Sequence, residues 1–287
     1  MLAFAVCTHD RGVPKLTAQL YPLMPDEAKT VSLEFDQSGR WEQVAQAEVQ
    51  TLGWSAHFRI EDWDITQNVR YRVRHGKDAT FEGLIRRDPI DKDVIVIGAL
   101  SCNSSRTPGP RPKIIKNLKI QNPDLLFFAD DQSYHHTQHT LGWLEFGLQF
   151  REILKDRPSI CIPDDHDLGQ GNIWGENGRK AAQPAGDDGG FFYPAKFVNM
   201  VQRCQTGHLP DAFDPTPIER GIDFTNLEDR KFKSRPRGKI PQMGPRADHI
   251  NDRAMTETRS MCPVQPCLGT VKSAFCKPEG RTGKAPS

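Results

Sequence analysis

Residues able to hold a metal ion follow three short apolar runs in this chain of 287 residues. Cys102 comes after VIVIGAL (94–100), Asp131 follows DLLFF (124–128), and DDHD (164–167) follows SICIP (159–163). Continuous apolar runs of this length predict strands that are buried on both faces. In open α/β sheets, ligands collect beyond the carboxyl ends of the strands. We therefore expect one edge of a sheet to carry thiolate, carboxylate, phenol and imidazole groups together.

The DDHD sequence contains Asp164, Asp165 and His166, and it favours a metal site. Neighbouring carboxylates repel and raise each other's pKa, and a bound cation removes that cost. Helix capping or an Asx turn is the alternative role for a short acidic side chain, but it explains one Asp and not the whole group. The Gly-rich stretch that follows predicts a loop passing close to a ligand, with Asn172 as a neutral oxygen donor.

The second apolar run adds Asp131 and Tyr134 as candidate ligands. An Asp can bridge two cations through its two oxygens, and a phenolate is a hard ligand that suits a trivalent ion. Cys102 is either a thiolate ligand at the same edge or an inert buried thiol. The three histidines of YHHTQHT (134–140) are interpreted as loop residues and not as ligands.

The elements that must position these residues change in character along the chain. Residues 30–87 contain five strand-like stretches (TVSLEF, AEVQTLGW, AHFRIEDW, VRYRVRHG and ATFEGLIRR), which predict a small antiparallel β-sandwich. Buried strands separated by helices are predicted after residue 93, and the clearest helix spans 141–155 with its aromatic residues in the core. We expect an N-terminal β-sandwich domain (1–90), a catalytic domain (91–225) and a basic, poorly ordered tail (226–287).

Composition excludes several classes of partner. The formal charge is +1, and the charges are spread along the chain, so the sequence predicts no nucleic-acid-binding surface. No apolar stretch is long enough to predict a membrane span. The opening MLAFAVC lacks a basic leader, which predicts a cytoplasmic protein as written and an exported one only with a different N-terminus. The seven scattered cysteines predict neither a disulfide framework nor a zinc site.

Three motifs of the chain resemble, in order, those of the PhoD-like metallophosphatases, the alkaline phosphatase D family. The motifs are ALSCNSS (99–105), NPDLLFFADDQSY (122–134) and SICIPDDHDLGQGNIWGENG (159–178), and the resemblance extends over about 71–222. It implies an α/β fold of the metallophosphoesterase type, in which a sheet sandwich flanked by helices is preceded by a small N-terminal β-sandwich. It also implies hydrolysis of phosphate mono- and diesters.

The resemblance implies a role for each matching residue. Cys102 and Tyr134 would bind an iron-like ion, and Asp131 would bridge it to a second metal such as calcium. Asp164 or Asp165 would join the shell of the second metal, while His166 would lie beside the scissile ester. The implied cofactors are iron and calcium, or another divalent pair, and the implied substrate is a phosphate ester.

The chain also departs from the family pattern. Asp130 stands where the family usually has Gly, and the family's later Gly-Asp or Ser-Asp-x-His element is not found in the sequence. The alternative is therefore a catalytically inactive remnant that acts, if at all, as a binding module. A glycosidase that uses Asp131 and Asp165 is a third possibility, but it explains neither Cys102 nor Tyr134.

Overall fold

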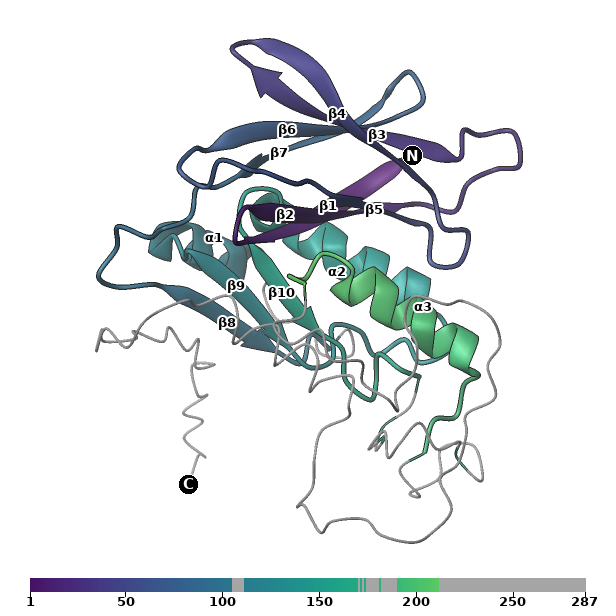
Figure 1. Ribbon diagram of the computed structural model, residues 1–287. Helices are drawn as coiled ribbons and strands as arrows, with labels where there is room; N and C mark the ends of the chain where they lie inside the picture. Colours follow the sequence, from purple (N-terminus) through teal and green to yellow (C-terminus); the bar gives the residue numbers. More distant parts are fainter. Residues whose placement is uncertain (105–110, 170, 172, 174–180, 182–189, 212–287) are drawn as a thin grey trace, which may run out of the picture.

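The computed structural model describes residues 1–104, 111–169, 171, 173, 181 and 190–211. The described part is layered, with two antiparallel sheets above a layer of helices and a parallel sheet below it (Figure 1). The predicted basic tail (226–287) lies outside the described residues. Among the described helices, none is both long and apolar enough to cross a membrane.

The N-terminal half forms the two sheets of a β-sandwich, as the sequence predicts. One sheet has the order β1-β2-β5 and the other has the order β4-β3-β6-β7, and all their strand pairs are antiparallel. The strands are β1 (Leu2–Asp10), β2 (Val13–Leu20), β3 (Thr30–Gln37), β4 (Arg40–Glu48), β5 (Ser55–Arg59), β6 (Val69–His75) and β7 (Ala79–Ile85).

Alternation along β6 explains how the four-stranded sheet has one face in the core and one face in water. Tyr71 and Val73 are fully buried, whereas Arg70 and Arg74 are exposed to solvent. Successive side chains of a strand point to opposite faces, so the VRYRVRH pattern specifies one buried and one charged face. Arg74 pairs with the buried carboxylate of Glu34 at 3.0 Å, which compensates that charge.

Three strands of the N-terminal half differ from the sequence prediction. β1 and β2 were not predicted, because every residue of β1 is buried and the strand therefore shows no alternation of apolar and polar residues. β4 spans Arg40–Glu48, whereas the sequence favoured a strand at 47–54, where the chain instead turns at 51–54. β4 is mostly exposed and polar, so it has no buried face that would produce a hydrophobic pattern.

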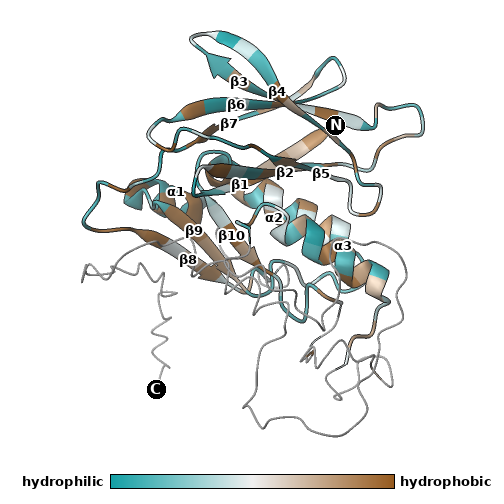
Figure 2. Cartoon of the chain, viewed as in Figure 1, coloured by the Kyte–Doolittle hydropathy of each residue, from teal (hydrophilic) through white to brown (hydrophobic). Residues whose placement is uncertain are grey.

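The second half alternates strands and helices around a parallel sheet of order β10-β9-β8. The elements are β8 (Ile97–Ser101), α1 (Arg111–Gln121), β9 (Leu125–Ala129), α2 (His139–Leu154), β10 (Ser159–Ile162) and α3 (Ala195–Thr206). β8 differs from the prediction of a strand buried on both faces, because Ala99 and Ser101 are exposed at the edge of the described sheet. These strands are among the most apolar elements in Figure 2.

Helix α2 packs between the sandwich and the parallel sheet. Trp143 and Phe146 are fully buried, which confirms the predicted core role of the helix aromatics. On the sandwich side, the ring of Phe4 in β1 meets Trp143 edge-on with centroids 5.4 Å apart. On the other side, Phe128 of β9 meets Phe146 at 5.0 Å. Gly147 lets the helix approach β1, because a Cβ there would overlap the Phe4 ring.

Candidate metal centre

The carboxyl ends of β8, β9 and β10 lie level at one edge of the parallel sheet. Ser101 of β8 and Ile162 of β10 are both aligned with Ala129 of β9. The loops that follow are joined directly, since the backbone N–H of Asn103 donates to the carbonyl of Asp131 at 2.8 Å. Residues that follow different strands are therefore brought to one place, where ligands bind in sheets of this kind.

Three non-glycine residues at this edge have left-handed backbone conformations. The φ angles are 55° at Cys102, 59° at Asp130 and 40° at Asp131. Such conformations are unfavourable for residues with a Cβ and cluster at functional sites, where the surrounding structure holds them. Asp tolerates this region better than most residues, which explains how Asp130 can occupy a position suited to Gly.

The side chains at this edge form a compact group of possible ligands. Asp131, Asp165 and His166 each offer one ligand atom, and these atoms lie within 4.8 Å of one another. Sγ of Cys102 lies 3.9 Å from Oδ2 of Asp131. The hydroxyl of Tyr134 contacts both Cys102 and Asp131. Asp131 is thus close to a thiol, a phenol, a carboxylate and an imidazole.

The carboxylates of the group are difficult to ionise together. Burial, and then the charges of Asp165, Asp130 and Asp131, raise the pKa of Asp164 from 3.8 to about 7. Burial also raises the pKa values of Asp130 and Asp131, and the charge of Asp165 adds to both shifts. Like charges that share a site repel, so this edge has a deficit of positive charge that a cation would supply.

Two further observations fit a metal ion to these residues. Oδ1 of Asp131 is buried and has no hydrogen-bond partner among the described residues, although buried polar atoms normally have one. Burial and its contacts with Cys102 and Asp131 raise the pKa of Tyr134, so its hydroxyl keeps its proton in the absence of a cation. Thiolate, phenolate, carboxylate and imidazole together match the ligand preferences of a transition metal such as iron.

Asp167 joins the loop after β9 to the loop after β10 through hydrogen bonds. Its buried carboxylate accepts hydrogen bonds from the backbone N–H groups of Gln132, Ser133 and Asp164, at 3.1, 2.9 and 3.2 Å. The side-chain amide of Gln205 in α3 donates a fourth, at 3.0 Å. Burial raises the pKa of Asp167 to about 8, and these donors oppose the shift by stabilising the ionised form. Asp167 therefore fixes the loops on which Asp131 and His166 lie.

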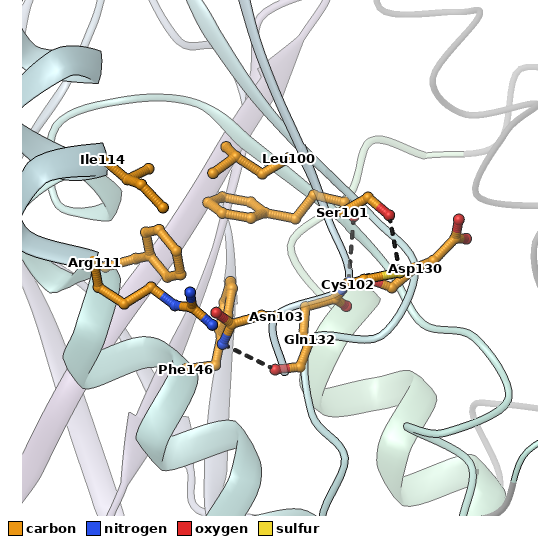
Figure 3. Close-up of a pocket in the computed structure, with 11 residues that line it drawn as sticks. Leu100, Ser101, Cys102, Asn103, Arg111, Ile114, Asp130, Gln132 and Phe146 are labelled. Carbon is orange, nitrogen blue, oxygen red and sulfur yellow. Dashed lines mark hydrogen bonds between the residues drawn. The ribbon is translucent and has the colours of Figure 1, made fainter. Parts of the chain in front are cut away.

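A small pocket of about 60 Å³ lies beside Cys102 and Asp130 (Figure 3). Asn103 lines it and is fixed by hydrogen bonds to Oε1 of Gln149 at 3.0 Å and to the carbonyl of Gln132 at 3.3 Å. The pocket is far below the several hundred Å³ of a typical small-molecule site. This pocket is therefore too small to hold an organic substrate.

Six of the seven site residues predicted from the sequence are described, and they lie at this one edge: Cys102, Asp131, Tyr134, Asp164, Asp165 and His166. Asn172 lies outside the described residues. The sequence analysis missed the contacts of Asp167 and of His136. Asp167 belongs to the DDHD sequence, but three of its four donors come from distant segments, at Gln132, Ser133 and Gln205. His136 was interpreted as a loop residue, and only the density of histidines after Tyr134 marks it in the sequence.

Comparison with known proteins gives a fold and no close relative. No family model matches the chain, and no curated protein matches it. A solved structure of PhoD matches with a TM-score of 0.55 and 16% identity, over 77% of this chain and 48% of that chain. A purple acid phosphatase from yellow lupin seeds matches with a TM-score of 0.45 and 11% identity, over 71% and 40% of the two chains. The chain spans about half the length of the PhoD structure, and its fold is of the α/β metallophosphoesterase type.

Proposed function

We propose that the chain is a metal-dependent hydrolase of phosphate esters with a dinuclear metal site. The observation that carries the proposal is the position of Asp131, whose carboxylate lies close to Cys102 and Tyr134 and also to Asp165 and His166. A carboxylate has two oxygens, so one that lies among several possible ligands is suited to bridge two cations. The sequence motifs that resemble the PhoD-like family and the similarity in fold to PhoD support the same reaction class.

The two ions would use different donors. Cys102, Tyr134 and Asp131 would hold an iron-like ion. Asp131, with Asp164 or Asp165, would also hold calcium or another divalent ion, and Asn172 is proposed as a further ligand. Cys102 and Tyr134 must lose their protons to act as ligands, so the affinity for metal is expected to rise with pH.

When bound, such cations neutralise charge on phosphoryl oxygens and lower the pKa of water from 15.7 to about 7, which makes hydroxide available. The chain's own residues would supply position and protons. The left-handed loops and Asp167 hold the acidic group in place before substrate arrives, and such preorganisation is a major source of catalysis. His166 would carry a proton on Nε2 and give it to the leaving oxygen as the P–O bond breaks. Proton donation of this kind typically contributes about 10²- to 10⁴-fold.

The test is metal analysis combined with turnover. The purified chain should contain iron and a divalent metal, and it should release nitrophenol from 4-nitrophenyl phosphate or bis(4-nitrophenyl) phosphate. Asp131→Asn should lower both metal content and turnover, because the amide cannot bridge two cations. The matched control is Asp91→Asn, which changes an exposed carboxylate paired with Arg87 at 2.8 Å and should leave both unchanged.

The same experiment separates the alternative of an inactive binding module. Bound metal with no turnover on either ester would favour that alternative. A folded chain that neither binds metal nor releases nitrophenol would refute the metal site and the hydrolase together. Circular dichroism with a cooperative melt shows whether the chain tested is folded.

A further inference from the structure

His136 lies next to His166 and hydrogen-bonds to it. Nε2 of His136 and Nδ1 of His166 are 2.5 Å apart. The two rings are nearly parallel, with an interplanar angle of 22° and centroids 4.8 Å apart. Tyr134 covers a face of the same His166 ring, with centroids 4.4 Å apart. His166 is therefore held at one ring nitrogen by His136 and on one face by Tyr134.

The backbone around His136 is also fixed. The N–H of Ser133 donates to Asp167, and the N–H of His135 donates to the hydroxyl of Ser133 at 3.1 Å. Asp167 is one residue beyond His166, so the same carboxylate anchors the loops that carry both histidines. The contact between the two rings thus joins two segments that are both fixed by hydrogen bonds to Asp167.

The arrangement determines which nitrogen of His166 faces the acidic group. Nε2 of His166 lies 3.9 Å from Oδ1 of Asp165, and a carboxylate on that side favours a proton on Nε2. Nδ1 is then the acceptor, and Nε2 of His136 is the donor. A neutral imidazole has one donor and one acceptor nitrogen, so fixing Nδ1 as the acceptor leaves an N–H at Nε2.

We infer that His136 is a positioning residue that fixes the ring orientation and tautomer of His166, so that Nε2–H points toward the leaving oxygen of a phosphate ester. The inference rests on the proposed function for the identity of the substrate. Partners that orient a functional imidazole through its second nitrogen commonly change activity by about 10- to 100-fold when removed.

Two substitutions separate the hydrogen bond from simple packing. His136→Gln keeps an N–H donor, whereas His136→Phe keeps a planar ring and removes the donor. His135→Ala is the matched control, because Nε2 of His135 pairs with Glu145 of α2 at 2.8 Å and not with His166.

The first measurement is nitrogen-15 NMR of the histidine side chains in the metal-free chain. His166 should show the Nε2–H tautomer in the wild type, in His136→Gln and in His135→Ala, and a mixture of tautomers in His136→Phe. An unchanged His166 signal in His136→Phe would overturn the inference. This outcome is independent of turnover.

The second measurement compares phenyl phosphate with 4-nitrophenyl phosphate. Phenolate is the more basic leaving group and depends more on a proton from His166. His136→Phe should lower kcat on phenyl phosphate about 10- to 100-fold, with a much smaller change on the nitrophenyl ester and rescue by His136→Gln. An equal loss on both esters would overturn the positioning role. No turnover by the wild type on either ester would instead refute the proposed function, and the NMR result would still decide whether His136 orients His166.

Discussion

Without a metal ion, the stability of the chain is expected to fall as the pH rises from about 4 to 7. The reason is the acidic group around Asp164, whose pKa is raised from 3.8 to about 7 in the folded chain. Between these values the folded state keeps a proton that the unfolded state releases. A folded state that binds more protons loses stability as the pH rises, so the contribution is complete below about 3.8 and is lost near 7.

The size of the effect follows from the same shift. At 1.36 kcal/mol per pKa unit, full conversion for Asp164 gives about 4 kcal/mol. Asp164 is only half-buried, and solvent screening reduces this value to about 2 kcal/mol. For a folded region of this size, that loss corresponds to a decrease in Tm of about 4 to 8 °C. A cation at 100 times its Kd would add about 2.7 kcal/mol and reverse the loss at high pH.

The assay is a thermal melt of chelator-treated protein at several pH values, with and without added iron or calcium. The added cation should raise Tm strongly near pH 8 and weakly near pH 5, where protons compete for the same oxygens. A double variant, Asp131→Asn with Asp165→Asn, should weaken the pH dependence, because it removes two of the charges that act on Asp164, and should remove the response to cation. Asp91→Asn should behave like the wild type. Equal stability of the metal-free chain at both pH values, or a double variant that still responds to cation, would refute the reasoning.

Three further predictions concern the elements that hold the site. Asp167→Ala should lower the free energy of unfolding by about 3 to 5 kcal/mol in a urea titration, because four N–H donors lose their acceptor. A loss below about 1 kcal/mol would contradict the role of Asp167 in holding the two loops together. Gly147→Ala should cost about 1 to 3 kcal/mol through overlap with Phe4, while Leu148→Ala on the exposed side of α2 should cost much less. Asp130→Gly should raise Tm of the metal-free chain near pH 8, since it removes both a left-handed Asp and one repelling carboxylate; a lower Tm would show that neither cost is present.

The parts of the fold that could be predicted are those whose pattern is local. The apolar runs predicted β9 and β10 within one or two residues, and the helical spacing of Trp143 and Phe146 predicted α2. β1 is buried on both faces by elements that are distant in sequence, and β4 packs too little apolar surface to show a period. The division into domains near residue 90 remains a prediction.

The candidate site, too, could be predicted only where its residues follow a local pattern. The sequence could place Asp131 and Asp165 at the ends of neighbouring strands, because parallel strands end at the same edge of a sheet. It could not show that Asp167 accepts bonds from both loops, or that His136 reaches across to His166, because these contacts join residues 30 or more positions apart. Residue types predicted the ligands, whereas only the tertiary arrangement identified the residues that hold them.

The burial of β1 against α2 has a consequence for synthesis of the chain. β1 leaves the ribosome well before α2, because the face of the helix that covers it, at His139–Leu154, is made more than a hundred residues later. At typical elongation rates of about 5 to 20 residues per second, the strand waits roughly 7 to 30 seconds for its helix. During that interval the pairing of β1 with β2 is what holds Phe4 and its neighbours in a strand. A nascent chain that stalls before residue 139 therefore exposes an aggregation-prone strand to other polypeptides.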